Sequence, residues 1–162
     1  LDAAVIAIDV DLHRAAAVPM YDEPLVVLTP KDHPWAGRSD VSPAELDDEK
    51  LLLLDEGNCL RDQTLALCQR YGTNPPVAVA TTLSTVVRMV AHGAGVTVIP
   101  EGALGLLNDD EHGVAHFADN AAVRRIGLVH RSSSSRTGDF QHLASVITEL
   151  ARGAGLPMLP TA

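Results

Sequence analysis

The sequence has no long apolar run, and this absence argues against a membrane-spanning protein. Its longest apolar stretches, such as residues 51–54, fall far short of the ~20 residues that a bilayer-crossing helix needs. The chain also begins with neither Met nor the basic start of a secretion signal. We therefore expect a fragment of a longer cytoplasmic protein that makes no membrane contact.

Basic residues are also scarce. The chain has 12 Lys and Arg against 21 Asp and Glu, a net charge of −9, and no run rich in Lys or Arg. Non-specific affinity for nucleic acid depends on cations that displace counterions from phosphates, so a polyanion is repelled on average. This segment is therefore not expected to be a DNA-binding surface.

Only two cysteines occur, Cys59 and Cys68, and no C-x-x-C motif is present. In a chain without an export signal, a cysteine pair is more often catalytic, metal-binding or redox-sensing than a static crosslink. The spacing of this pair does not suit zinc, and His112-x-x-x-His116 lacks the Glu that follows the first His of a metalloprotease motif. We predict no metal site and no cofactor, and we expect these histidines to be surface or loop residues.

Short β-type runs alternate with helical patterns along the chain, which is typical of an α/β fold with much parallel sheet. Helices are expected from Ser42, from Thr82 or Ser84 to His92, and over residues 137–151 with Phe140 and Leu143 in an apolar stripe that continues through Val146, Ile147 and Leu150. Strands are expected at residues 3–8, 25–29, 51–54, 77–81, 96–99 and 125–130.

The first cysteine is predicted to stand where a helix begins. Residues 55–58 are turn formers after a strand, whereas residues 60–71 favour a helix that Gly72 would end, with Leu60, Thr64, Leu67 and Tyr71 on one side. At a helix N-terminus, unpaired backbone N–H groups favour thiolate over thiol, and the thiolate is the form that attacks peroxide. Cys59 is therefore a candidate reactive cysteine.

The second cysteine follows nine residues later, so an ideal helix would separate the pair by roughly 13–14 Å in rise, on opposite faces. A disulfide requires Cα atoms within about 7 Å, so pairing would require part of the helix to unwind. The polar run 61–64 is expected to have little apolar area tying it to the core. From the residues alone, two buried and unreactive cysteines remain an open alternative.

A resemblance to a known family favours the redox interpretation. Residues 57–63, Gly-Asn-Cys-Leu-Arg-Asp-Gln, with Cys68 further on, resemble the peroxide-sensing segment of the OxyR family of LysR-type transcription regulators, where a His usually stands in place of Asn58. Residues 32–36 (Asp-His-Pro-Trp-Ala) and 89–100 are similar to segments of LysR-type effector domains in general. The resemblance covers nearly the whole chain.

The resemblance implies a two-lobed effector domain like the periplasmic binding proteins. Residues 23–122 would form lobe II, and residues 1–22 and 123–162 a lobe I that is incomplete at its N-terminal side. Cys59 matches the peroxidatic cysteine, and Cys68 matches the resolving cysteine that captures it as a disulfide.

The resemblance also implies a set of polar neighbours for the reactive thiol. Asn58, Asp62, Gln63 and Arg124 correspond to this environment. A permanent guanidinium charge suits a nearby thiolate, and an amide can both donate to and accept from peroxide oxygens. Asn58 cannot take over proton handling by the usual His and offers only hydrogen bonds.

By the same resemblance, the expected partners are hydrogen peroxide, DNA through an upstream helix-turn-helix domain, RNA polymerase, and further copies in a homodimer or tetramer. The chain would be a regulator and not an enzyme. Two alternatives stay open: a thiol peroxidase that uses the same two cysteines, and a LysR-type domain that binds a small metabolite while its cysteines are incidental.

Overall fold

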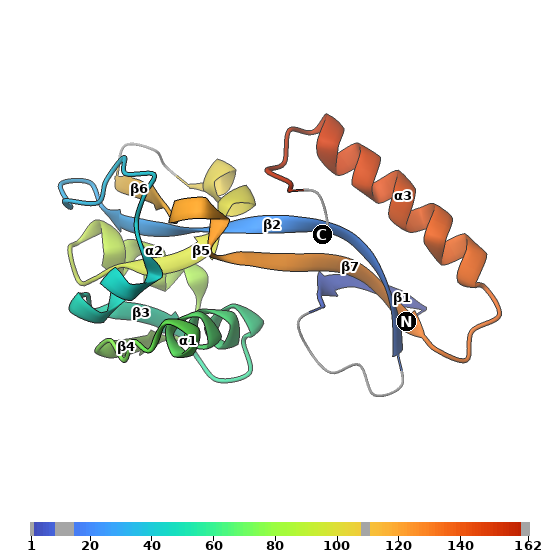
Figure 1. Ribbon diagram of the computed structural model, residues 1–162, viewed down its shortest axis with the longest axis horizontal. Helices are drawn as coiled ribbons and strands as arrows, with labels where there is room; N and C mark the ends of the chain where they lie inside the picture. Colours follow the sequence, from blue (N-terminus) through green and yellow to red (C-terminus); the bar gives the residue numbers. More distant parts are fainter. Residues whose placement is uncertain (1, 9–14, 108–110, 160–162) are drawn as a thin grey trace. The chain divides into compact units, whose positions relative to one another are not determined.

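The computed structural model describes residues 2–8, 15–107 and 111–159, and the chain forms two compact units (Figure 1). Unit 1 comprises Leu1–Pro24 and Val123–Ala162, and unit 2 comprises Leu25–Ala122. The assignment of these units as lobes I and II of an effector domain stays a prediction. None of the described helices is both long enough and apolar enough to span a bilayer.

Unit 1 is an antiparallel sheet with one helix. Its strands are β1 (Ala3–Ala7), β7 (Val123–Arg131) and the first part of β2 (Ala15–Pro30), in the order β1-β7-β2. Helix α3 (Thr137–Gly153) packs on β7, and Met20, Leu128, Phe140 and Ala144 form a small core there.

The apolar stripe predicted for α3 is partly wrong. Phe140 is buried, but Leu143, Val146 and Leu150 are exposed, and the other buried positions of the helix are Ala144 and Ala151. These positions follow the i, i+4, i+11 spacing of a single helix face. The two alanines on that face are small and allow the helix to lie close to its neighbours. The prediction relied on large apolar residues and therefore missed this face.

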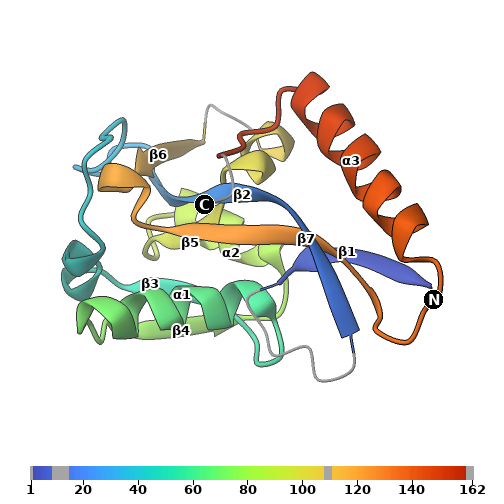
Figure 2. The ribbon, with the colours of Figure 1, turned by 45° about the vertical axis from the view of Figure 1, so that its right-hand side comes forward.

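Unit 2 combines two sheets with helices. The second part of β2 pairs antiparallel with β5 (Thr97–Pro100) and β6 (His112–His116), while β3 (Leu51–Leu54) and β4 (Val77–Ala80) pair in parallel. Figure 2 shows helix α1 (Cys59–Tyr71) lying along β3 and β4, and α2 (Leu83–Ala91) also packs on these strands. Short 3-10 helices are η1 (Pro43–Asp48), η2 (Glu101–Leu106) and η3 (Ala118–Asn120).

The core of unit 2 explains why β3 and β5 are built mainly from apolar residues. Every side chain of β3 and β5 is buried, because each strand is covered on both faces. Val86 and Val90 of α2 are buried in this core, and Thr82, one of the two expected caps, caps that helix. The strand that precedes α1 is therefore firmly held.

The α/β class is confirmed, but the expectation of much parallel sheet is wrong. Of the five strand pairings among the described residues, only that of β3 with β4 is parallel. A parallel pair needs a long crossover, and α1 supplies one between β3 and β4. In contrast, β5 and β6 both run antiparallel to β2.

Candidate redox site

Cys59 is the first residue of α1, as predicted. The chain leaves β3 at Leu54 and turns through residues 55–58, where Gly57 has a φ of +83° that favours glycine. The side-chain Oδ1 of Asn58 then accepts a hydrogen bond from the backbone N–H of Leu60 at 3.0 Å and caps the helix. Cys59 is a free and exposed thiol in the first turn.

Asn58 has a clear local role that does not depend on proton transfer. Asn is among the best N-cap residues because its short side chain satisfies an otherwise unpaired N–H of the first turn. Asn58 adopts the extended backbone typical of this position, with φ of −93° and ψ of 121°. The residue that departs from the family pattern therefore still fixes where the helix begins.

Two further charged residues lie in the first turn of α1. The Nη1 of Arg61 donates to the carbonyl oxygen of Leu54 at 3.0 Å and so ties the first turn to the end of β3. Asp62 is exposed, and its negative charge suits the positive end of the helix dipole. The Arg61 contact was not predicted, because it depends on how the strand and the helix meet.

The middle of α1 is better anchored than expected. Gln63 is half-buried, and its Oε1 lies out of contact with solvent. Thr64 is 1% exposed, and its hydroxyl donates to the carbonyl of Leu60 at 2.8 Å. The expectation that residues 61–64 have little area in contact with the core is therefore wrong for Thr64, which joins Leu60 and Leu67 on the buried face. Tyr71, expected on this face, is exposed.

Cys68 differs sharply from Cys59. Its side chain is 3% exposed and packs within the core of unit 2. Burial raises the pKa of the Cys68 thiol, since a thiolate loses solvation there, and a hydrogen bond from the side chain of Thr73 offsets part of this effect. The two cysteines are thus both free and occupy the two ends of one helix, one exposed and one buried.

Arg124 lies on β7 in unit 1, whereas the other five predicted site residues lie in unit 2. Glu23 of β2 is its partner in the antiparallel register, and the Nε and Nη2 atoms of Arg124 lie 2.8 and 2.7 Å from Glu23 Oε2. Its neighbour Arg125 donates to both carboxylate oxygens of Asp22, from Nε at 2.7 Å and from Nη2 at 2.9 Å. The role of Glu23 was not predicted, although its strand pairing with Arg124 explains it.

The histidines considered for zinc were expected to be surface or loop residues, and both lie on a strand with partly exposed side chains. Both His112 and His116 belong to β6. The Nε2 of His112 lies 3.1 Å from the carbonyl of Val87, and that of His116 lies 3.1 Å from Glu101 Oε1. Within residues 2–8, 15–107 and 111–159, no three His, Cys, Asp or Glu side chains gather as metal ligands would.

Comparison with known proteins shows which family this chain belongs to. Residues 1–152 match the model of the LysR substrate binding domain, and solved OxyR structures are similar over nearly the whole chain. The chain belongs to the LysR substrate-binding domain family, in its OxyR group. The family resemblance drawn from residues 57–63 and the LysR-type effector fold are thereby confirmed.

Individual relatives have closely related names. A probable hydrogen peroxide-inducible genes activator of Mycobacterium avium is 44% identical over 153 residues, which are 93% of this chain and 49% of the relative. The DNA-binding transcriptional dual regulator OxyR of Escherichia coli K12 is 36% identical over 91% of this chain and 49% of its own length. The chain thus spans about half the length of the curated relatives it matches.

Among solved structures, the H2O2-bound form of a Corynebacterium glutamicum OxyR mutant has a TM-score of 0.87 and 36% identity, covering 99% of this chain and 54% of the other. The reduced OxyR regulatory domain from Pseudomonas aeruginosa has a TM-score of 0.75 and 33% identity, covering 92% of this chain and 73% of the other. The fold and the sequence of this chain are thus similar to those of OxyR regulatory domains.

Proposed function

We propose that this chain is the regulatory part of a LysR-type DNA-binding transcription regulator, and that it senses hydrogen peroxide by oxidation of Cys59 and formation of a disulfide with Cys68. The observation that carries the proposal is the placement of the two thiols at opposite ends of α1, with Cys59 exposed in the first turn and Cys68 buried near the last. The similarity to OxyR proteins supports it.

The proposed chemistry has two steps. The Cys59 thiolate attacks one oxygen of hydrogen peroxide, the O–O bond breaks, and the products are a Cys59 sulfenic acid and, after protonation of the leaving hydroxide, water. The sulfur of Cys68 then attacks that of Cys59, the S–O bond breaks, and a second water leaves with the thiol proton of Cys68. Peroxide is reduced and the two thiols are oxidised.

We further propose that Asn58, Asp62, Gln63 and Arg124 form the polar environment of the peroxide and the thiolate. Asn58 and Asp62 flank Cys59 in the first turn, where they support the helix start. The part assigned to Gln63 is to bind peroxide oxygens, since an amide both donates and accepts. For Arg124 the support is its match to the family, and Glu23 holds its guanidinium in a fixed orientation.

The whole protein is proposed to act in the cytoplasm as a homodimer or tetramer. It would bind DNA through a helix-turn-helix domain upstream of this chain and contact RNA polymerase. In this proposal oxidation is a signal and not turnover, so the protein is not an enzyme. No membrane partner is proposed.

Peroxide stoichiometry tests this function against the alternatives. Reduced protein should consume about one equivalent of peroxide per chain and lose two thiols, and added dithiol should restore both. Cys59→Ser should abolish the reaction, and Cys68→Ser should stop it at a sulfenic acid. Continued consumption of many equivalents with a reductant would indicate a thiol peroxidase. A metabolite response that survives Cys59→Ser, without any peroxide reaction, would indicate a metabolite-binding domain.

A further inference from the structure

The carbonyl oxygen of Cys68 is held by donors beyond the end of α1. Gly72 adopts the left-handed conformation with a φ of 70°, and its N–H points at the carbonyls of Cys68 and Gln69. The backbone N–H of Thr73 donates to the Cys68 oxygen at 3.0 Å, and the Thr73 hydroxyl donates to the same oxygen at 3.2 Å. The backbone bonds are the pattern that ends many helices, and the threonine hydroxyl is an addition to it.

The next residue ties this helix end to a distant element. The backbone N–H of Asn74 donates to Asp47 Oδ1 at 2.6 Å, a contact that spans 27 residues of the chain. Asp47 belongs to η1, which packs against α1 and buries Leu46 completely. Two contacts therefore restrain the end of α1: Thr73 binds the Cys68 carbonyl oxygen, and Asp47 of η1 binds the backbone N–H of Asn74.

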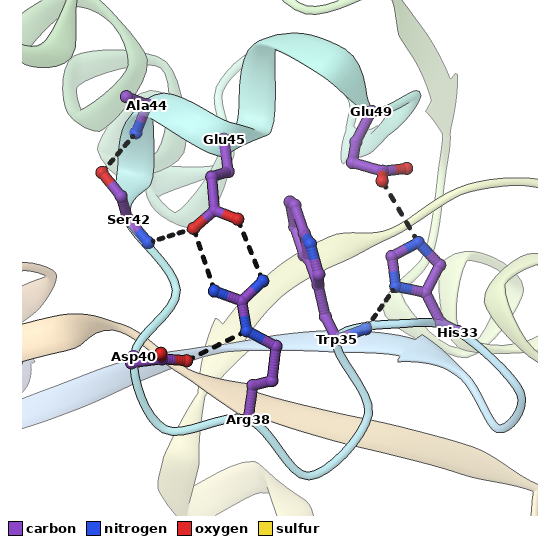
Figure 3. Close-up of polar contacts among 8 residues, drawn as sticks. All are labelled: His33, Trp35, Arg38, Asp40, Ser42, Ala44, Glu45 and Glu49. Atoms are coloured by element: carbon purple, nitrogen blue, oxygen red, sulfur yellow. Dashed lines mark hydrogen bonds and ion pairs between the residues drawn. The ribbon is translucent and has the colours of Figure 1, made fainter.

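The element that presents Asp47 is itself braced at both ends (Figure 3). At its start, Ser42 and Glu45 form a capping box, and the guanidinium of Arg38 reaches both oxygens of Glu45 at 2.9 and 3.3 Å. After its end, Glu49 Oε1 lies 3.2 Å from Nε2 of His33. An acceptor on such an element has a fixed position, so a bond to it restrains its partner.

We propose that Thr73 and Asp47 are positioning residues that form a latch on Cys68 and set the rate at which this cysteine reaches oxidised Cys59. The proposal rests on the disulfide function proposed above. In the helix, the two residues are separated by roughly 13–14 Å in rise, whereas a disulfide needs Cα atoms within about 7 Å. Cys68 must also leave a site in which it is 3% exposed. The bonds of Thr73 and Asp47 restrain the end of the helix that this movement displaces.

The latch acts on one step of the reaction only. Its contacts lie at the last turn of α1 and the chain beyond it, whereas Cys59 lies in the first turn. Formation of the sulfenic acid should therefore be independent of the latch. Disulfide formation should be faster when the latch is cut, because opening of the helix end precedes the attack by Cys68. In the intact protein the latch would prolong the life of the sulfenic acid.

Two pairs of variants test the latch. Thr73→Val removes the hydroxyl, and Thr73→Ser keeps it. Asp47→Ala removes the acceptor of the Asn74 bond, whereas Asp47→Asn keeps an oxygen there and removes only the charge. Asp47 also acts electrostatically on Cys68, so this second pair separates the bond from the charge.

The measurement is a single-turnover reaction of each reduced protein with hydrogen peroxide. A sulfenic-acid probe reports the first step, and mass spectrometry of quenched samples reports the disulfide. Thr73→Val and Asp47→Ala should form the disulfide about fivefold faster than the parent, the effect of one net hydrogen bond, with an unchanged first step. Thr73→Ser and Asp47→Asn should stay within about twofold of the parent.

A second readout requires no peroxide. In a Cys59→Ser background, the latch variants should raise the rate at which an aromatic disulfide reagent labels Cys68, because labelling requires the same opening. Unchanged disulfide and labelling rates in both Thr73→Val and Asp47→Ala would overturn the latch. Equal acceleration by Asp47→Asn and Asp47→Ala would overturn it in favour of a charge effect. A parent protein that forms no disulfide at all would overturn the proposed function, and the latch with it.

Discussion

At the scale of single residues, the main contrast is between two cysteines of one helix. Cys59 is exposed at its start, whereas Cys68 is 3% exposed near its end and has a pKa raised by burial. Reaction with peroxide or an alkylating reagent requires both access and a thiolate. The exposure of Cys59, and the burial and raised pKa of Cys68, make Cys59 the residue that we expect to react first.

Limiting alkylation tests this order. Folded, reduced protein treated with less than one equivalent of iodoacetamide should carry the label on Cys59, and peptide mass spectrometry locates it. Denatured protein, in which both thiols are accessible, is the control and should show a much smaller preference. Labelling of Cys68 first in the folded protein would reverse the roles proposed for the two cysteines.

Replacement of Arg124 tests its proposed part in the thiolate environment. Arg124→Ala should slow the oxidation of Cys59 by peroxide, because a permanent positive charge favours a nearby thiolate. Arg125→Ala is a matched control, since Arg125 is the next residue on β7 and also pairs with a buried carboxylate. Both variants lose a charge-assisted pair, so similar losses of about 1–3 kcal/mol in the free energy of unfolding are expected.

Stopped-flow measurement of the peroxide reaction distinguishes the two arginines. A slower rate in Arg124→Ala alone supports its role. Equal rates in both variants and the parent would remove Arg124 from the site.

The features of the site that the sequence predicted are those decided by neighbouring residues. The turn at residues 55–58, the start of α1 at Cys59 and its end at Gly72 are decided by residues next to one another in sequence, so their preferences predict them. The contacts of Glu23 with Arg124 and of Asp47 with Asn74 span 101 and 27 residues. Such contacts depend on how separate elements pack, and no local pattern reports them.

At the scale of elements, α1 is defined by its two ends. Asn58 caps the first turn and Gly72 ends the last, while Leu60, Thr64 and Leu67 hold the helix to the core of unit 2. A helix of 13 residues is marginal in isolation, so its stability depends on these caps and this packing. A disulfide between Cys59 and Cys68 must therefore overcome the stabilisation that both the caps and the packing give to α1.

Replacement of the N-cap tests how the first turn is held. Asn58→Ala should lower the free energy of unfolding by about 1 kcal/mol, because the N–H of Leu60 loses its acceptor. Asn58→Asp keeps a side-chain oxygen and should remain close to the parent. Urea denaturation measures both. A loss of equal size in Asn58→Asp would show that the cap bond is not the cause.

Hydrogen exchange tests where oxidation changes the structure. Reduced and peroxide-oxidised protein should differ most within residues 55–75 and in the segments packed against them, because the short chain between the cysteines must absorb the change in their separation. The amides of β2 and β7 in unit 1 should change little and serve as an internal reference. Identical exchange of α1 in the two states would contradict the unwinding of this helix.

The bounds of two strands show where sequence preferences predict an element well and where they do not. The bounds predicted for the strand at residues 51–54 agree with β3, because a run of four leucines is bounded by charged and turn-forming residues. The prediction of residues 25–29 misses more than half of β2, which spans Ala15–Pro30. Residues 15–17 are alanines with little strand preference, and their pairing with β7 makes them part of the strand.

At the scale of the whole chain, the order of elements was predicted better than the directions of the strands. Alternation of strands and helices led to the correct α/β class, but β2 pairs antiparallel with β5, β6 and β7. Alternation predicts parallel pairing only where a helix crosses between adjacent strands, as α1 does between β3 and β4. The family motif at residues 57–63 was therefore more informative about the fold than the pattern of strands.

Peptide mapping tests most directly whether hydrogen peroxide joins Cys59 to Cys68. Protein treated with about one equivalent of peroxide is alkylated under denaturing conditions, digested without reduction and analysed by mass spectrometry. We expect one intramolecular crosslink, between the peptides that carry Cys59 and Cys68, which is absent before treatment and disappears with dithiol. Two alkylated cysteines after treatment, or crosslinks found only between separate chains, would contradict it.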